Sequence, residues 1–103
     1  MELDLSTPQA AIKSMFRAAL IRNIDMYMQC ISDNEKLSRS FRQISKASQN
    51  RLFKYQQSKP VYHKDNQAKV KVTLNPKGKP ETVIFILAKI NGDWLITDFE
   101  ESR

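Results

Sequence analysis

The spacing of apolar residues changes near the middle of the chain. Up to about residue 57 they recur every three or four positions, the spacing of amphipathic helices. From about residue 59 to 99 they alternate at every second position, the spacing of strands. The pattern predicts an α+β domain with three N-terminal helices packed on an antiparallel sheet of about four strands. The 103 residues are the size of a single domain, assigned to 1–103.

The first predicted helix starts at a clear signal. Thr7 is a good N-cap, and Pro8 at the first helical position loses no needed hydrogen bond. Asn23 is predicted to be a left-handed C-cap. The apolar stripe of this helix comprises Ile12, Met15, Phe16, Ala19 and Leu20.

Two further helices are predicted. Asp25 can cap a short helix over 26–31, which would bury Tyr27, Cys30 and Ile31. A capping box, Ser32 with Glu35 three residues later, opens a helix that runs to about Tyr55. Its predicted core positions are Leu37, Phe41, Ile44, Ser48, Leu52 and Tyr55.

Four strands follow in the sequence. Residues 60–63 predict a short edge strand, because Pro60 cannot donate to a ladder. Residues 68–74 alternate as a half-buried strand, and residues 82–90 are apolar throughout, as in a central strand. Asn91-Gly92 is a strong hairpin signal before the last strand, 94–99.

The register of that hairpin decides which residues share a face. With a two-residue turn, Trp94 and Ile96 lie on the same face as Phe85 and Leu87. With a three-residue bulged loop, they lie instead with Ile84, Ile86, Ala88 and Ile90. We favour the bulged loop because it places Lys89 on the outer face.

Either register leaves large apolar residues on both faces of the last two strands. The helices can cover one face, so the other needs a second cover. A curled sheet that buries itself would provide one, and a partner subunit, which we favour, would provide another. The favoured register predicts a dimer face made of Leu95, Thr97, Phe99, Phe85 and Leu87.

The charge of the chain is concentrated in its middle. The net charge is +6, and no acidic residue occurs between Lys36 and Lys64. Arg39, Arg42 and Lys46 share one helical stripe and are predicted to be exposed. We favour a solvated face over an acidic protein partner or a membrane surface. Nucleic acid is disfavoured, because the standard binding motifs are missing from the sequence.

Several classes of protein do not fit this composition. One cysteine, Cys30, excludes an intrachain disulfide, and one histidine, His63, does not suffice for a zinc site. The sequence has no transmembrane segment and no visible signal peptide. We expect no cofactor. The sequence does not fix the localisation: the absence of a visible signal indicates a cytoplasmic protein, and export after signal removal is the alternative.

The order of short motifs resembles that of a known family. The chain has Ser6-Thr-Pro-Gln-Ala-Ala11 at the first helix, Asn23-Ile-Asp25 between helices and Asn91-Gly-Asp-Trp-Leu-Ile96 near its end. This is similar to the nuclear-transport-factor-2-like (cystatin-like, ketosteroid-isomerase-type) superfamily, near short bacterial members and the lumazine-binding-like group. The resemblance implies a cone-shaped domain of helices on a curved sheet. The superfamily includes isomerases, dehydratases and non-catalytic accessory domains, so the fold alone does not give the function.

Catalysis in this fold needs a general base and an oxyanion donor inside the cone. The pocket candidates are Tyr27, Tyr62, Trp94 and Asp98. No second carboxylate lies in a predicted core stripe, so we predict no catalytic residues. The favoured reading is a non-catalytic association module, acting as a homodimer or as an accessory domain of a larger assembly. The first alternative is a small apolar-ligand-binding protein or an isomerase- or dehydratase-type enzyme that uses the cone pocket. The second alternative is a basic adaptor for an acidic partner.

Overall fold

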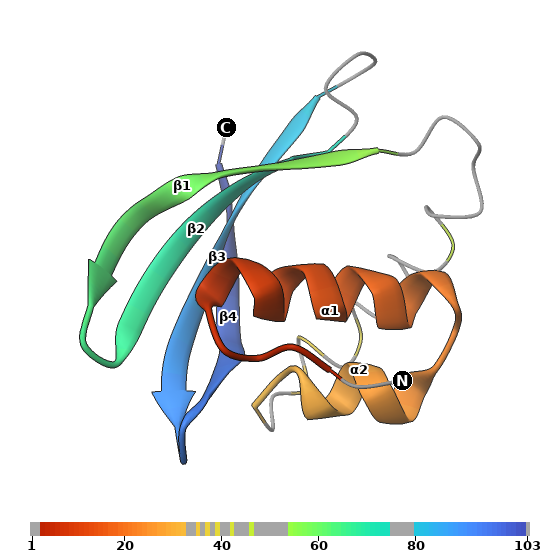
Figure 1. Cartoon of the computed structure of the whole chain (residues 1–103). Coiled ribbons are helices and arrows are strands. Elements are labelled where there is room, and N and C mark those ends of the chain that lie inside the picture. The colour runs from red at the N-terminus through yellow and green to blue at the C-terminus, as the bar shows by residue number, and fades with distance from the viewer. Residues whose placement is uncertain are drawn as a thin grey trace.

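The computed structural model combines a helical layer with one curved sheet (Figure 1). It describes residues 3–32, 35, 37, 39, 42, 46, 54–74 and 80–102. The strands are ordered β1-β2-β3-β4, every pair is antiparallel, and α1 lies against the concave side of the sheet. The predicted α+β class is therefore confirmed. The elements are α1 Pro8–Leu20, α2 Ile24–Gln29, β1 Tyr55–Lys64, β2 Gln67–Leu74, β3 Glu81–Ile90 and β4 Asp93–Ser102.

Helix α1 begins where its sequence signal predicts. The hydroxyl of Thr7 accepts a hydrogen bond from the backbone N–H of Ala10 at 3.1 Å, and Pro8 occupies the first helical position. The stripe of Ile12, Met15, Phe16 and Ala19 is buried, as predicted. Leu20 was expected in that stripe but is 59% exposed; it is the last residue of α1, and its neighbour Ala19 is fully buried.

The corner between α1 and α2 differs from the prediction. Arg22, not Asn23, takes the left-handed conformation, with φ 58°. Asn23 instead caps α2, and its side-chain oxygen accepts from the N–H of Met26 at 3.1 Å. Asp25 therefore lies in the first turn of α2, where its carboxylate interacts favourably with the positive end of the helix dipole.

Most of the third predicted helix lies outside the described residues. Glu35, Leu37, Arg39, Arg42 and Lys46 each have helical conformation, and Leu37 is buried. Phe41, Ile44, Ser48 and Leu52 are not among the described residues.

The sheet begins earlier in the chain than predicted. Tyr55 was expected at the end of the third helix but is the first residue of β1, where it pairs with Leu74. Its ring stacks on Phe16, with centroids 4.2 Å apart. This packing against a distant helix overrides the local helical spacing of Tyr55.

The last hairpin has a two-residue turn, so the favoured bulged loop was wrong. Ile90 pairs with Asp93 across the turn, and both Asn91 (φ 52°) and Gly92 (φ 87°) are left-handed. Lys89 therefore opposes Trp94 on the inner face. This is tolerated because Lys89 lies at the end of β3 and stays exposed.

A bulge does occur in β4, six residues after the turn begins. Leu87 pairs with Ile96 and Ile86 pairs with Asp98, so Thr97 is the extra residue. The bulge shifts the rest of β4 by one position. Phe99 consequently opposes Phe85, and Glu100 opposes Ile84.

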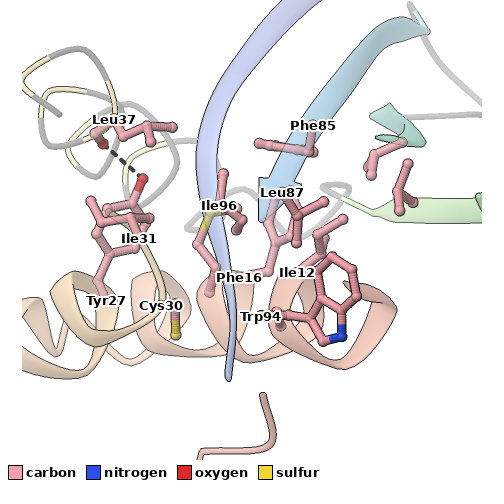
Figure 2. Close-up of a cluster of buried hydrophobic side chains, with 14 of the residues drawn as sticks. Ile12, Phe16, Tyr27, Cys30, Ile31, Leu37, Phe85, Leu87, Trp94 and Ile96 are labelled. Atoms are coloured by element: carbon pink, nitrogen blue, oxygen red, sulfur yellow. Dashed lines mark hydrogen bonds between the residues drawn. The ribbon is translucent and has the colours of Figure 1, made fainter. Parts of the chain in front are cut away.

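The core lies between α1, α2 and the inner face of the sheet (Figure 2). Alternate residues of β2, namely Ala68, Val70 and Val72, are buried as predicted. The predicted burial of Tyr27, Cys30 and Ile31 is also confirmed. The thiol of Cys30 donates to the carbonyl of Met26 at 3.3 Å, and burial raises its pKa to about 11.

The chain leaving α2 fastens the helical layer to the edge of β4. Ile31 forms a parallel bridge with Ile96. The N–H of Ile96 donates to the carbonyl of Cys30 at 3.0 Å, and the N–H of Ser32 donates to the carbonyl of Ile96 at 2.9 Å. Further along the same edge, the N–H of Trp94 donates to the carbonyl of Leu5 at 2.9 Å.

The turn conformation gives a test of the hairpin register. Substituting Gly92→Ala should lower the free energy of unfolding by about 1 kcal/mol, because an L side chain is strained at positive φ. A Cβ at this position would meet nothing within 4 Å, so the cost is backbone strain rather than a clash. Urea denaturation measures it. Asn91→Gly serves as the control and should change stability by less than about 0.5 kcal/mol. Equal stability of Gly92→Ala and wild type would contradict the two-residue turn.

The buried thiol predicts a loss of stability at alkaline pH. The unfolded thiol ionises near pH 9, whereas the folded thiol stays protonated up to about pH 11. The contribution of Cys30 is therefore complete below pH 9 and declines above it, with a slope approaching about 1.4 kcal/mol per pH unit. Denaturation curves between pH 8 and 10 measure this decline. Cys30→Ala should flatten the slope in that window, and an unchanged slope would show that other groups cause it.

Candidate functional site

Tyr27, the first predicted pocket residue, is a core residue. Its side chain is fully buried, and its hydroxyl donates to the carbonyl of Leu37 at 2.9 Å (Figure 2). Burial raises the pKa of this phenol well above its usual range. A neutral hydroxyl that already donates inside the core is not placed to exchange protons with a bound molecule.

Trp94, the second pocket candidate, is also part of the core. It is buried, and the ring of His63 packs edge-on against it with centroids 5.3 Å apart. His63 itself is exposed, on the edge strand β1. The pair covers one end of the core and brings no carboxylate or phenol to it.

Tyr62 and Asp98, the other two candidates, lie on the opposite side of the sheet. Tyr62 opposes Lys69, and Asp98 opposes Ile86, both of which belong to the outer face. Asp98 accepts a hydrogen bond from the N–H of Phe99 at 2.7 Å. The sheet therefore separates these two residues from Tyr27 and Trp94, and the four do not form one pocket.

Aromatic packing fills the space between α1 and the sheet. Phe16 stacks on Tyr55 and meets Phe85 edge-on, with the latter centroids 6.0 Å apart. The ring of Phe85 in turn packs beside that of Phe99, with centroids 6.2 Å apart. These four rings therefore pack against one another between α1 and the sheet.

A shallow hollow of about 240 Å³ lies outside this core, between the N-terminal segment, α1 and α2. The Ser14 hydroxyl donates to the backbone carbonyl of Asp4 at 3.0 Å, which holds the N-terminal segment on α1. Hydrogen bonds from Ser6 lower the pKa of the Asp4 carboxyl. No pattern in the sequence predicts this hollow, because it depends on how the first residues fold back on α1. Its lining is Leu3, Asp4, Ala10, Lys13, Ser14, Arg17 and Met26.

The outer face of the sheet carries a continuous row of aliphatic side chains. We define this outer face by the aliphatic row of β3 and by Leu95, which opposes Ala88 on β4. These residues are partly exposed, and Ile90 is 40% exposed. The row on β3 comprises Ile84, Ile86, Ala88 and Ile90.

The predicted dimer face is therefore partly corrected. Phe85 and Leu87 are core residues, 5% and 0% exposed, and Phe99 packs beside Phe85. The two-residue turn places Phe85 and Leu87 inside, and the bulge at Thr97 turns Phe99 inward. Thr97 is half-buried, and its hydroxyl donates to the carbonyl of Ile86 at 3.1 Å. Leu95 remains on the outer face.

Charged residues flank the aliphatic row on both sides. Lys69 and Lys71 on β2 are exposed, and Lys69 pairs with Ile86 while Lys71 pairs with Ile84. On the other flank, Asp98 and Glu100 of β4 oppose the same two isoleucines. The outer face thus has a basic side, an apolar centre and an acidic side.

The predicted basic stripe lies in the helical layer, away from this pattern. Arg39, Arg42 and Lys46 are all exposed, as their spacing predicts. Arg39 forms a salt bridge with Glu35 one turn earlier, and both side chains are largely exposed. Such an exposed pair contributes little to stability.

Neither a metal-binding cluster nor a membrane-spanning helix occurs in the described part of the chain. There, no cluster of three or more His, Cys, Asp or Glu side chains could hold a metal ion. Among the same residues, no helix is long and apolar enough to cross a bilayer.

Comparison with known proteins gives matches at the level of structure alone. No protein-family model and no curated protein matches the chain. An NTF2-like protein of unknown function from Shewanella oneidensis is 18% identical, with a TM-score of 0.60 over 90% of this chain and 93% of that one. A cystatin-like-fold protein of unknown function from Nostoc punctiforme is 14% identical, with a TM-score of 0.63 over 99% and 96%.

A further match is a phospholipid-binding protein from Ralstonia solanacearum in complex with a phospholipid. It is 9% identical, with a TM-score of 0.58 over 95% of this chain and 77% of that chain. Identities this low establish the fold and not a shared ligand. The chain has the nuclear-transport-factor-2-like, cystatin-like fold, which confirms for the fold the resemblance drawn from its motifs.

Proposed function

We propose that this protein is a non-catalytic association module that works as a homodimer through the outer face of its sheet. The single observation that carries the proposal is the aliphatic row of β3, which no element among the described residues covers. A row of isoleucines bordered by charged residues is the composition of an interface centre with a polar rim.

The edges of the sheet support a face-to-face contact rather than strand addition. On β4, the N–H groups of Trp94 and Ile96 already donate to Leu5 and Cys30. On β1, Pro60 lacks a donor, and the pairing with β2 is irregular on both sides of it. Extension of the sheet by another strand is therefore disfavoured at both edges, and the outer face remains.

The size of the outer face also suits a small dimer. Strands β2 to β4 span about 10 Å from axis to axis, and side chains widen this surface to about 20 Å. Ten-residue strands are about 33 Å long. The projected area is therefore about 600 Å² per subunit, at the lower end of stable interfaces, which bury about 1,200–2,000 Å² in total.

The positions of the candidate catalytic groups favour an association module over an enzyme. The Tyr27 hydroxyl donates a hydrogen bond inside the core, and Asp98 lies on the other side of the sheet. Tyr27 and Asp98 therefore cannot act together on one substrate. The phospholipid complex of the Ralstonia protein does not bear on the ligand of this chain, because the two proteins are only 9% identical.

We expect the Leu95→Lys variant to shift the protein from dimer toward monomer. The added charge would lose hydration within the interface, and we expect the dissociation constant to rise at least tenfold. Sedimentation equilibrium over a range of concentrations measures this constant. The folded structure should be kept, because Leu95 is only half-buried in the subunit.

Leu20→Lys is the matched control for this experiment. Leu20 is more exposed than Leu95 and lies at the end of α1, away from the sheet. It should leave the dissociation constant unchanged. A wild-type protein that stays monomeric at high concentration would overturn the proposal, and an equal effect of both substitutions would place the interface elsewhere.

A further inference from the structure

The charges on the outer face carry information about how two copies would pack. Lys69, Ile86 and Asp98 form one row across β2, β3 and β4. Lys71, Ile84 and Glu100 form the next row. In both rows the cation and the carboxylate lie one strand away from β3, on opposite sides.

We infer that the two subunits are related by a twofold axis that runs along β3, so that the lysines of each subunit contact the carboxylates of the other. This inference rests on the proposed homodimer and specifies its geometry. Rotation about an axis parallel to the strands places β2 of one subunit over β4 of its partner. It keeps each residue at the same height along the strand. Lys71 therefore faces the partner's Glu100, and Lys69 faces the partner's Asp98.

The alternative twofold axis runs across the strands. It would place β2 over the partner's β2 and β4 over the partner's β4. Lysines would then meet lysines and carboxylates would meet carboxylates, and such like-charge contacts oppose association. The arrangement of charge on this face thus distinguishes two packings that the aliphatic row alone would allow equally.

The separation of packed sheets fits the inferred contacts. Sheets that pack face to face lie about 10 Å apart. A lysine and a glutamate that extend from opposite sheets can close a gap of this size. Because the isoleucines of β3 would lie on the axis and meet their own copies, the most apolar strand would occupy the centre and the charged pairs the rim.

The experiment is a charge-reversal cycle on one pair of residues. The four proteins are wild type, Lys71→Glu, Glu100→Lys and the double variant, and sedimentation equilibrium at low salt gives each dissociation constant. Both residues are exposed in the subunit, so each chain should fold, and thermal unfolding of each variant checks this. We expect each single reversal to weaken the dimer at least tenfold, because both contacts become like-charged. The double variant should recover affinity to within about threefold of wild type, because both contacts are again complementary.

The possible outcomes separate this inference from the proposed function. If the wild type does not dimerise, the proposed function is wrong. If it dimerises and the single reversals leave the dissociation constant unchanged or lower it, the homodimer stands and the axis along β3 is wrong. An axis across the strands predicts one of these two results. There the reversed residue meets either its own copy, which is again a like-charged contact, or the partner's other residue of the original sign, which is now a complementary one. Single variants that weaken the dimer without recovery in the double variant would also overturn the pairing of Lys71 with Glu100.

Discussion

The extra residue at Thr97 decides which side chains of the last part of β4 face the core and which face outward. With uninterrupted pairing beyond Ile96, Asp98 would oppose Phe85 and Glu100 would oppose Val83, both buried in the core. Phe99 would then lie on the outer face. Burying the Asp98 carboxylate opposite Phe85 would cost several kcal/mol, more than one irregular step in a ladder. The bulge exchanges the two sets, so that Phe99 packs on Phe85 and both Asp98 and Glu100 stay on the outer face, while Glu101 takes the position opposite Val83 near the end of β4.

The same edge strand also holds the helical layer in place. The carbonyls of Leu5 and Cys30 accept from β4 backbone amides, and the N–H of Ser32 donates to the carbonyl of Ile96. These bonds satisfy backbone groups that an exposed edge would offer to another chain. They also fix the point from which α2 extends over the core. The same backbone hydrogen bonds therefore position the helices and protect the edge of the sheet.

Local signals predicted a large part of this fold. Thr7 and Pro8 begin α1, alternation in residues 68–74 defines the buried side of β2, and Asn91-Gly92 marks the hairpin. These features depend on residues close together in the chain. The predictions were wrong where contacts between residues far apart in the sequence determine the structure. Tyr55 belongs to β1, where it packs on Phe16, and Leu20 is exposed although it follows the helical spacing of the buried stripe.

The candidate site was harder to predict because it depends on register. A shift of one residue in β4 exchanges its two faces, so Leu95 and Phe99 were assigned to one surface although the bulge separates them. The flanking lysines of β2 follow directly from its alternation, but their relation to Asp98 and Glu100 requires the pairing of three strands. The hollow beside α1 was missed for a related reason, since Ser14 contacts Asp4 only once the first residues fold back.

The net charge of the chain bears on whether two copies can approach each other. A subunit of charge +6 repels its copy at long range, but at physiological salt this repulsion is screened beyond about 8 Å. What remains at contact is the charge of the surfaces that meet. The two lysines and two carboxylates flanking β3 balance, whereas Arg39, Arg42 and Lys46 lie in the helical layer. Salt should therefore have two opposing effects on the proposed dimer, since it reduces the overall repulsion and also weakens the pairs at the rim.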